Sequence, residues 1–156
     1  MADLLTHYVS ARLPGGFIAD PAARMTFLFG VFLPDFGAKG IDLILNLPDH
    51  AGAPTHSIAG LFVLTYALAL LFTPEFRFKA WTTMFAGSIL HVLVDMAKDN
   101  LGKGSANLLH PFTLDGFEFG LYYNENILYL LPTNVIAVWA MWWVAKKAQK
   151  RGWVWR

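Results

Sequence analysis

Three apolar runs constrain the fold of this chain more than any other feature of its sequence. They cover Ile58–Thr73, Ala80–Ala97 and Ile127–Val144, and each contains 16 to 18 residues. A helix that crosses a bilayer needs about 17 to 25 residues that are mostly apolar. The runs therefore predict an all-α, integral membrane helical bundle with about three long apolar helices and several shorter helices.

The composition favours the same class of protein. Hydrophobic residues make up 56% of the 156 residues and charged residues only 15%, whereas a soluble domain carries about 25% charged residues. The length fits a single domain over residues 1–156. Because the net charge is only +1, there is no general electrostatic basis for binding nucleic acid. We therefore expect membrane lipid, and no nucleic acid, as the partner.

Proline, glycine and polar residues predict the remaining elements. We expect a short helix over Met1–Arg12, and a second helix that Asp20–Pro21 open and that ends near Leu33. The Leu-Pro-Asp-Phe-Gly segment at 33–37 would end that helix. The other expected elements are a short helix over 41–47, a polar loop over 49–57, a tight connection over 75–79 and a long loop over 98–123.

The basic residues predict an orientation in the membrane. Of the 12 Lys and Arg residues, seven would lie at one end of the long helices: Arg77, Lys79, Lys146, Lys147, Lys150, Arg151 and Arg156. Basic segments remain in the cytoplasm. We therefore expect a multi-pass protein of the bacterial inner membrane, with the polar site described next on the extracytoplasmic face.

His91 and Asp95 are the most informative polar residues, because they lie four positions apart inside an apolar run. On a helix this spacing places both side chains on one face. Ionisable residues in such segments are costly and mark functional sites. A His and a carboxylate at this spacing suit two ligands of a divalent metal ion. Their alternative role is a buried His–Asp pair that orients helices.

Other candidate ligands lie at breaks or ends of the apolar segments. Because the chain has no cysteine, any metal site must use His, Asp and Glu. The candidates are His7, Asp35 within Leu33-Pro34-Asp35, His50 and His56 in one loop, and His110 before Pro111-Phe112. In order and spacing these motifs resemble the YdjM family of bacterial inner-membrane proteins, which are membrane-bound metal-dependent hydrolases. The resemblance runs from about Thr6 to Phe112, and the family is distantly similar to zinc-dependent phospholipase C.

The resemblance implies a phospholipase-C-like core and a particular set of ligands. Asp35, His56, His91 and Asp95 would bind one metal ion, and His7 with Asp95 would begin a second site. His50 and His110 are further candidates for contact with metal or substrate. The implied cofactor is one or two zinc ions, with manganese as the other choice. The chain departs from related sequences at Ala51, where they usually have Arg, and it lacks the helical His-x-x-x-Glu of the phospholipases.

The expected activity is hydrolysis of phosphoesters, with phospholipids as the leading substrate class. A divalent metal ion would activate the attacking water, and no side chain is assigned as the general base. The alternative is a non-catalytic membrane protein in which the metal is a structural clamp. A transporter fits less well, because Ile58–Phe72 offers only Thr65 and Tyr66 as polar groups.

Overall fold

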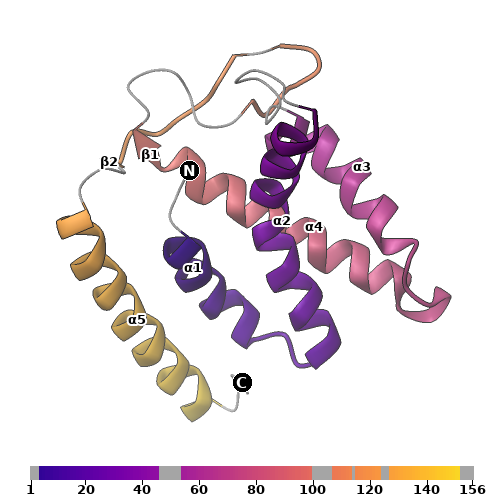
Figure 1. Ribbon diagram of the computed structural model, residues 1–156. Helices are drawn as coiled ribbons and strands as arrows, with labels where there is room; N and C mark the ends of the chain where they lie inside the picture. Colours follow the sequence, from indigo (N-terminus) through magenta and orange to yellow (C-terminus); the bar gives the residue numbers. More distant parts are fainter. Residues whose placement is uncertain (1–3, 46–53, 100–106, 114, 124–126, 152–156) are drawn as a thin grey trace.

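The computed structural model describes residues 4–45, 54–99, 107–113, 115–123 and 127–151, and the regular elements within these ranges are helices apart from one pair of very short strands (Figure 1). The strands β1 (Lys98–Asp99) and β2 (Tyr122–Tyr123) pair in parallel, with Lys98 opposite Tyr122. The helices are α1 (Leu4–Gly16), α2 (Pro21–Leu45), the 3₁₀ helix η1 (Pro54–His56), α3 (Ile58–Ala69), α4 (Pro74–Met96) and α5 (Ile127–Lys150).

The prediction of a membrane-spanning bundle with three long apolar helices is wrong. Among the described residues, no helix combines the length and the apolar character that crossing a bilayer requires. The helix α3 contains 12 residues, which is about 18 Å of rise against a hydrocarbon core of about 30 Å. The other two runs lie mainly in α4, which contains charged residues near both ends, and in α5, which contains them near its C-terminal end. The multi-pass topology and the extracytoplasmic position of the site stay predictions.

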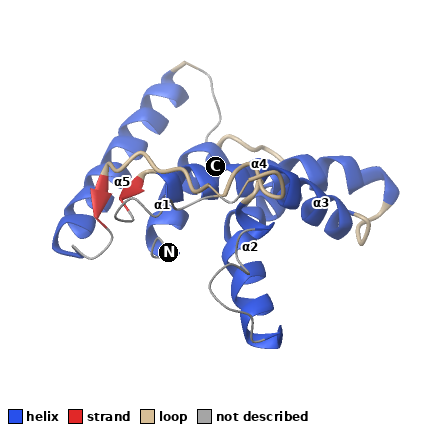
Figure 2. Ribbon diagram, turned by 90° about the horizontal axis from the view of Figure 1, so that it is seen from above, coloured by secondary structure: helices blue, strands red, loops and turns tan. Residues whose placement is uncertain are grey.

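The close crossing of α2 and α4 positions the rest of the molecule. Figure 2 shows α2 running across the direction of α4. A glycine lies on each side of the crossing: a Cβ atom at Gly30 would overlap the Met84 backbone, and one at Gly87 would overlap the Phe27 carbonyl group. The backbones can approach this closely only because both positions lack a side chain. Val31 is fully buried beside this crossing.

The helix α2 continues through Pro34, so the prediction that it ends near Leu33 is wrong, and residues 41–45 belong to the same helix. A proline inside a helix removes one N–H donor, and the carbonyl four residues earlier loses its partner. Here that carbonyl belongs to Gly30, and Ser88 on α4 donates a hydrogen bond to it at 2.9 Å. The neighbouring helix thus compensates for the proline.

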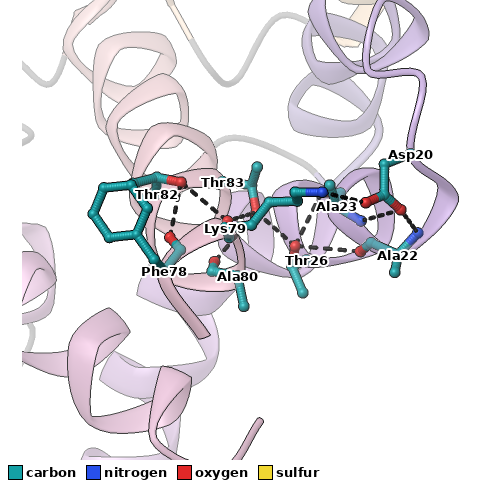
Figure 3. A network of polar contacts seen from close by, with 9 residues as sticks. All are labelled: Asp20, Ala22, Ala23, Thr26, Phe78, Lys79, Ala80, Thr82 and Thr83. Carbon is teal, nitrogen blue, oxygen red and sulfur yellow. Dashed lines mark hydrogen bonds and ion pairs between the residues drawn. The ribbon is translucent and has the colours of Figure 1, made fainter. Parts of the chain in front are cut away.

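A polar network joins the first turns of α2 and α4 (Figure 3). Asp20 caps α2, as predicted, by accepting a hydrogen bond from the Ala22 backbone N–H at 3.0 Å. Its other carboxylate oxygen lies 2.9 Å from Lys79 Nζ, and the hydroxyls of Thr26 and Thr83 are 2.6 Å apart. The hydrogen bond from Lys79 is the main cause that lowers the pKa of Asp20 below its ordinary value of 3.8.

Two further boundaries differ from the predictions. The helix α1 runs through Pro14 to Gly16, beyond the break expected after Arg12. Pro74 ends the first apolar run but also begins α4, so residues 75–79 form helical turns and not a tight connection. Ser57 caps α3 by accepting a hydrogen bond from the Gly60 N–H at 3.0 Å.

The last helix lies at the edge of the molecule. Figure 1 shows α5 beside α1, and these two helices are in contact. Large apolar side chains are exposed on α5 and also along α3 and α4, among them Trp139, Trp143, Val63, Tyr66 and Phe78. The high apolar content of the sequence therefore lies partly on the outer surface of the protein.

Candidate metal centre

Four predicted ligands come together beyond the crossing of α2 and α4. Asp35 comes from α2, His56 from the end of η1, and His91 with Asp95 from one face of α4. One donor atom from each of these residues lies within 4.8 Å of the donor atoms from the other three. Residues separated by up to 60 positions in the sequence therefore share one small volume.

Both imidazole rings direct Nε2 at the carboxylates. His91 Nε2 lies 3.2 Å from Asp95 Oδ2 and 3.8 Å from Asp35 Oδ1. His56 Nε2 lies 3.5 Å and 3.8 Å from the same two atoms. Asp35 and Asp95 are 3% and 4% exposed, and His91 is fully buried. The cluster reaches the surface through His56, whose side chain is 13% exposed.

The backbone of α2 fixes the orientation of His91. Its Nδ1 lies 2.7 Å from the Val31 carbonyl oxygen, and a carbonyl can only accept a hydrogen bond. Nδ1 must therefore carry the proton and donate it. In the neutral ring Nε2 is then the lone-pair nitrogen, which is the form that binds a metal ion.

The orientation of His56 depends on its neighbour in the sequence. Thr55 Oγ1 lies 3.1 Å from His56 Nδ1, and Thr55 is buried. When the hydroxyl accepts the Nδ1 proton, the lone pair of His56 is on Nε2 and faces the carboxylates. Both histidines thus have a group behind the ring that favours Nε2 as the donor atom to a metal.

His7 from α1 extends the cluster. Its Nε2 lies 3.4 Å from Asp95 Oδ1, and its ring stacks on His91 with the centroids 3.9 Å apart and an angle of 8° between the planes. His7 is fully buried. The two oxygens of Asp95 therefore face different histidines, an arrangement in which one carboxylate can bridge two metal ions.

The donor set suits a divalent cation. Among the described residues, His91 Nε2 has no hydrogen-bond partner, although two carboxylate oxygens lie nearby. A neutral His91 would direct its lone pair at negative oxygens, which is repulsive, so positive charge is needed between them. A proton on His91 would supply it within a buried ion pair with Asp95, and a divalent ion would supply it to all four residues together.

Of the two remaining candidates, only His110 lies among the described residues, and it does not join the cluster. His50 lies outside the described residues. His110 is half-buried, and its backbone N–H donates a hydrogen bond to the Asn107 carbonyl at 3.0 Å. His110 is not one of the four clustered residues. The sequence reasoning missed the supporting groups, which are the Thr55 hydroxyl and the Val31 carbonyl. For Thr55 the signal was its position directly before a candidate ligand.

Comparison with known proteins agrees with the resemblance seen in the motifs. Residues 2–156 match the model of a family described as YdjM inner membrane protein. No curated protein and no solved structure gives a significant match to the chain.

Proposed function

The chain belongs to the YdjM inner membrane protein family, and we propose that it is a metal-dependent hydrolase of phosphoesters at the membrane. In this proposal Asp35, His56, His91 and Asp95 bind a divalent ion, zinc as first choice and manganese as second. The observation that carries the proposal is the convergence of two imidazole nitrogens and two carboxylates within 4.8 Å of one another. Bound there, the ion would polarise a water molecule and a phosphoryl oxygen of the substrate.

The residues around the ion have separate tasks in this proposal. Asp35 and Asp95 supply negative charge in a buried position, where it attracts a divalent cation strongly. Val31 and Thr55 hold the two imidazole rings with Nε2 toward the centre. His56 lies on the exposed side of the cluster, so substrate would approach there. No protein side chain is assigned as a general base.

The preference for lipid phosphoesters rests on where such a protein operates. Its family is one of inner membrane proteins, and large apolar side chains lie exposed on α3, α4 and α5. A site on such a surface meets lipid headgroups, and divalent ions suit the negative charge of a phosphoester. Membrane lipid is therefore the proposed partner, and phospholipid-type phosphoesters are the proposed substrate class.

Metal content and turnover test the proposal together. Purified full-length protein should contain a stoichiometric divalent ion by elemental analysis, and His91→Ala or Asp95→Ala should remove it. His110→Ala is the matched control, since it removes a histidine outside the cluster. The metal-loaded protein should hydrolyse at least one member of a panel of phospholipids and soluble phosphomonoesters and phosphodiesters. A folded, metal-free wild-type protein would contradict the proposal.

One observation favours a second function, that of a structural metal clamp. Structural zinc sites use four protein ligands, whereas catalytic sites keep one position for water, and the cluster supplies four ligands of which three are buried. The clamp predicts metal binding without turnover on any phosphoester, and unfolding when the metal is chelated. Turnover that the His91→Ala variant abolishes would exclude it.

A further inference from the structure

A pocket separate from the metal centre lies between the ends of α1 and α5. Its volume is about 220 Å³, and five residues line it: Phe17, Val144, Lys147, Ala148 and Arg151. Phe17 directly follows α1, and the other four lie in the last turns of α5 or just after it. His7 lies nine residues before the end of α1, about 13 Å of helix rise away.

The lining combines an apolar floor with two cations. Phe17, Val144 and Ala148 provide the apolar surface, and no lining residue is acidic. Lys147 lies near the end of α5 and Arg151 directly follows the helix, and both line the pocket. The chemistry complements a ligand that has one anionic group joined to an apolar chain.

The surface next to the pocket extends this pattern along α5. Ile136, Trp139 and Trp143 precede Lys147 at spacings of three and four residues, so they form one stripe with it, and all three are exposed. The Lys147 ammonium lies 4.6 Å from the centroid of the Trp143 ring. Exposed tryptophans followed by basic residues are typical of the boundary between lipid headgroups and acyl chains.

We propose that this pocket binds one anionic phospholipid, with the phosphate between Lys147 and Arg151 and the start of an acyl chain over Phe17, Val144 and Ala148. The stripe of Ile136, Trp139 and Trp143 continues the apolar surface for that chain. The lipid is bound as a ligand that anchors α5 at the membrane, and it is not the substrate of the metal centre. The inference does not depend on the proposed hydrolase activity.

Native mass spectrometry of the full chain in nonionic detergent tests this inference. We titrate dioleoyl phosphatidylglycerol and dioleoyl phosphatidylcholine in parallel and measure the one-to-one adduct. The test variant is Lys147→Gln/Arg151→Gln, and its matched control is Lys146→Gln/Lys150→Gln, which removes the same charge from the same turns outside the pocket. At about fivefold per basic residue, the test variant should bind phosphatidylglycerol roughly 25-fold more weakly, and the control should retain most of its affinity.

Three results would overturn the inference. In the first, the two double variants lose the same affinity for phosphatidylglycerol, which would indicate a diffuse basic surface. In the second, both variants keep the affinity of the wild type. In the third, phosphatidylglycerol and phosphatidylcholine bind to the wild type equally well. The variant Ala148→Phe gives an independent test, because it fills the pocket and keeps both cations. It should weaken phosphatidylglycerol binding while the circular dichroism spectrum stays that of the wild type.

Discussion

One hydroxyl group, that of Thr55, supports the orientation of His56. This contact holds the ring with its Nε2 toward the carboxylates, and His56 is the partly exposed residue of the cluster. Groups that orient a ligand from behind typically contribute 10-fold to 100-fold in metal affinity. We therefore expect Thr55→Val, which keeps the shape but lacks the hydroxyl, to weaken metal binding by about that factor.

Calorimetric titration of the apoprotein with zinc measures this effect. Thr55→Ser keeps the hydroxyl and should bind zinc within a few-fold of wild type. If the valine and serine variants bind zinc equally well, Thr55 does not orient the ligand. Thermal unfolding of both variants without metal separates a loss of affinity from a loss of structure.

At the scale of residues, the sequence predicted which side chains would meet but not how they are held. His91 and Asp95 could be predicted to lie together from their spacing in an apolar run, because the helix period places them on one face. The grouping of Asp35 and His56 with them required the family resemblance, since nothing local brings α2 and η1 to α4. The Val31 carbonyl could not be predicted, because a backbone atom leaves no signal in the residue type.

The crossing of α2 and α4 is the element that sets the distance between the ligands. Gly30→Ala and Gly87→Ala would each place a methyl group against the backbone of the other helix, so the helices must move apart. Overpacking of this kind typically costs about 1–3 kcal/mol. Alanine gains roughly 1 kcal/mol over glycine in a helix, so the cost equals or exceeds this gain. Both variants should unfold at lower temperature and bind zinc more weakly.

Gly40→Ala on the same helix is the control for that prediction. Among the described residues, no atom beyond its own stretch of helix backbone lies within 4 Å of a Cβ at this position, so the variant should be as stable as the wild type or more stable by up to about 1 kcal/mol. Thermal denaturation followed by circular dichroism compares the three variants. Equal stability of Gly30→Ala and Gly40→Ala would mean that the crossing is looser than described.

The link between Asp20 and Lys79 gives α2 and α4 a contact that depends on pH. Because the pKa of Asp20 is lowered in the folded protein, its carboxylate adds stability above the ordinary pKa of 3.8, and this is lost as the pH falls through the lower folded value. Asn at this position still caps the helix but carries no charge. The unfolding temperature of Asp20→Asn should therefore lie below that of wild type at pH 6, and the difference should narrow below about pH 4.

Helix boundaries were predictable where the signal lies within one helix. They were less predictable where a neighbouring helix supplies a stabilising hydrogen bond. Asp20 and Ser57 begin their helices as their cap preferences indicate. Pro34 was expected to end α2, but Ser88 on α4 satisfies the carbonyl that the proline leaves free, and only the tertiary structure supplies that donor. The prediction of membrane-spanning helices was wrong for a related reason, because the hydropathy of an apolar run does not reveal where its helix begins and ends.

Across the whole molecule, the candidate metal centre brings together segments that lie far apart in the sequence. His7 lies on α1, Asp35 on α2, His56 on η1, and His91 with Asp95 on α4, whereas α5 is in contact with α1 and supplies none of the four clustered ligands. A ligand that binds only the folded state stabilises it, by about 2.7 kcal/mol at a concentration 100 times its dissociation constant. That stabilisation should appear first in the segments that the metal connects.

Hydrogen exchange followed by mass spectrometry tests this distribution. Adding zinc to the apoprotein should slow exchange in peptides that cover residues 26–45, 54–60 and 84–96, and leave peptides from residues 135–150 nearly unchanged.

The Asp95→Asn variant should show no such slowing at the same zinc concentration, because it loses the carboxylate that faces His7, His56 and His91. Equal protection of α5 and α4 would show that zinc acts on the global unfolding of the chain, and protection that persists in Asp95→Asn would place the ion elsewhere. The measurement must be made under native conditions, because each segment then exchanges through its own local opening and not through complete unfolding of the chain.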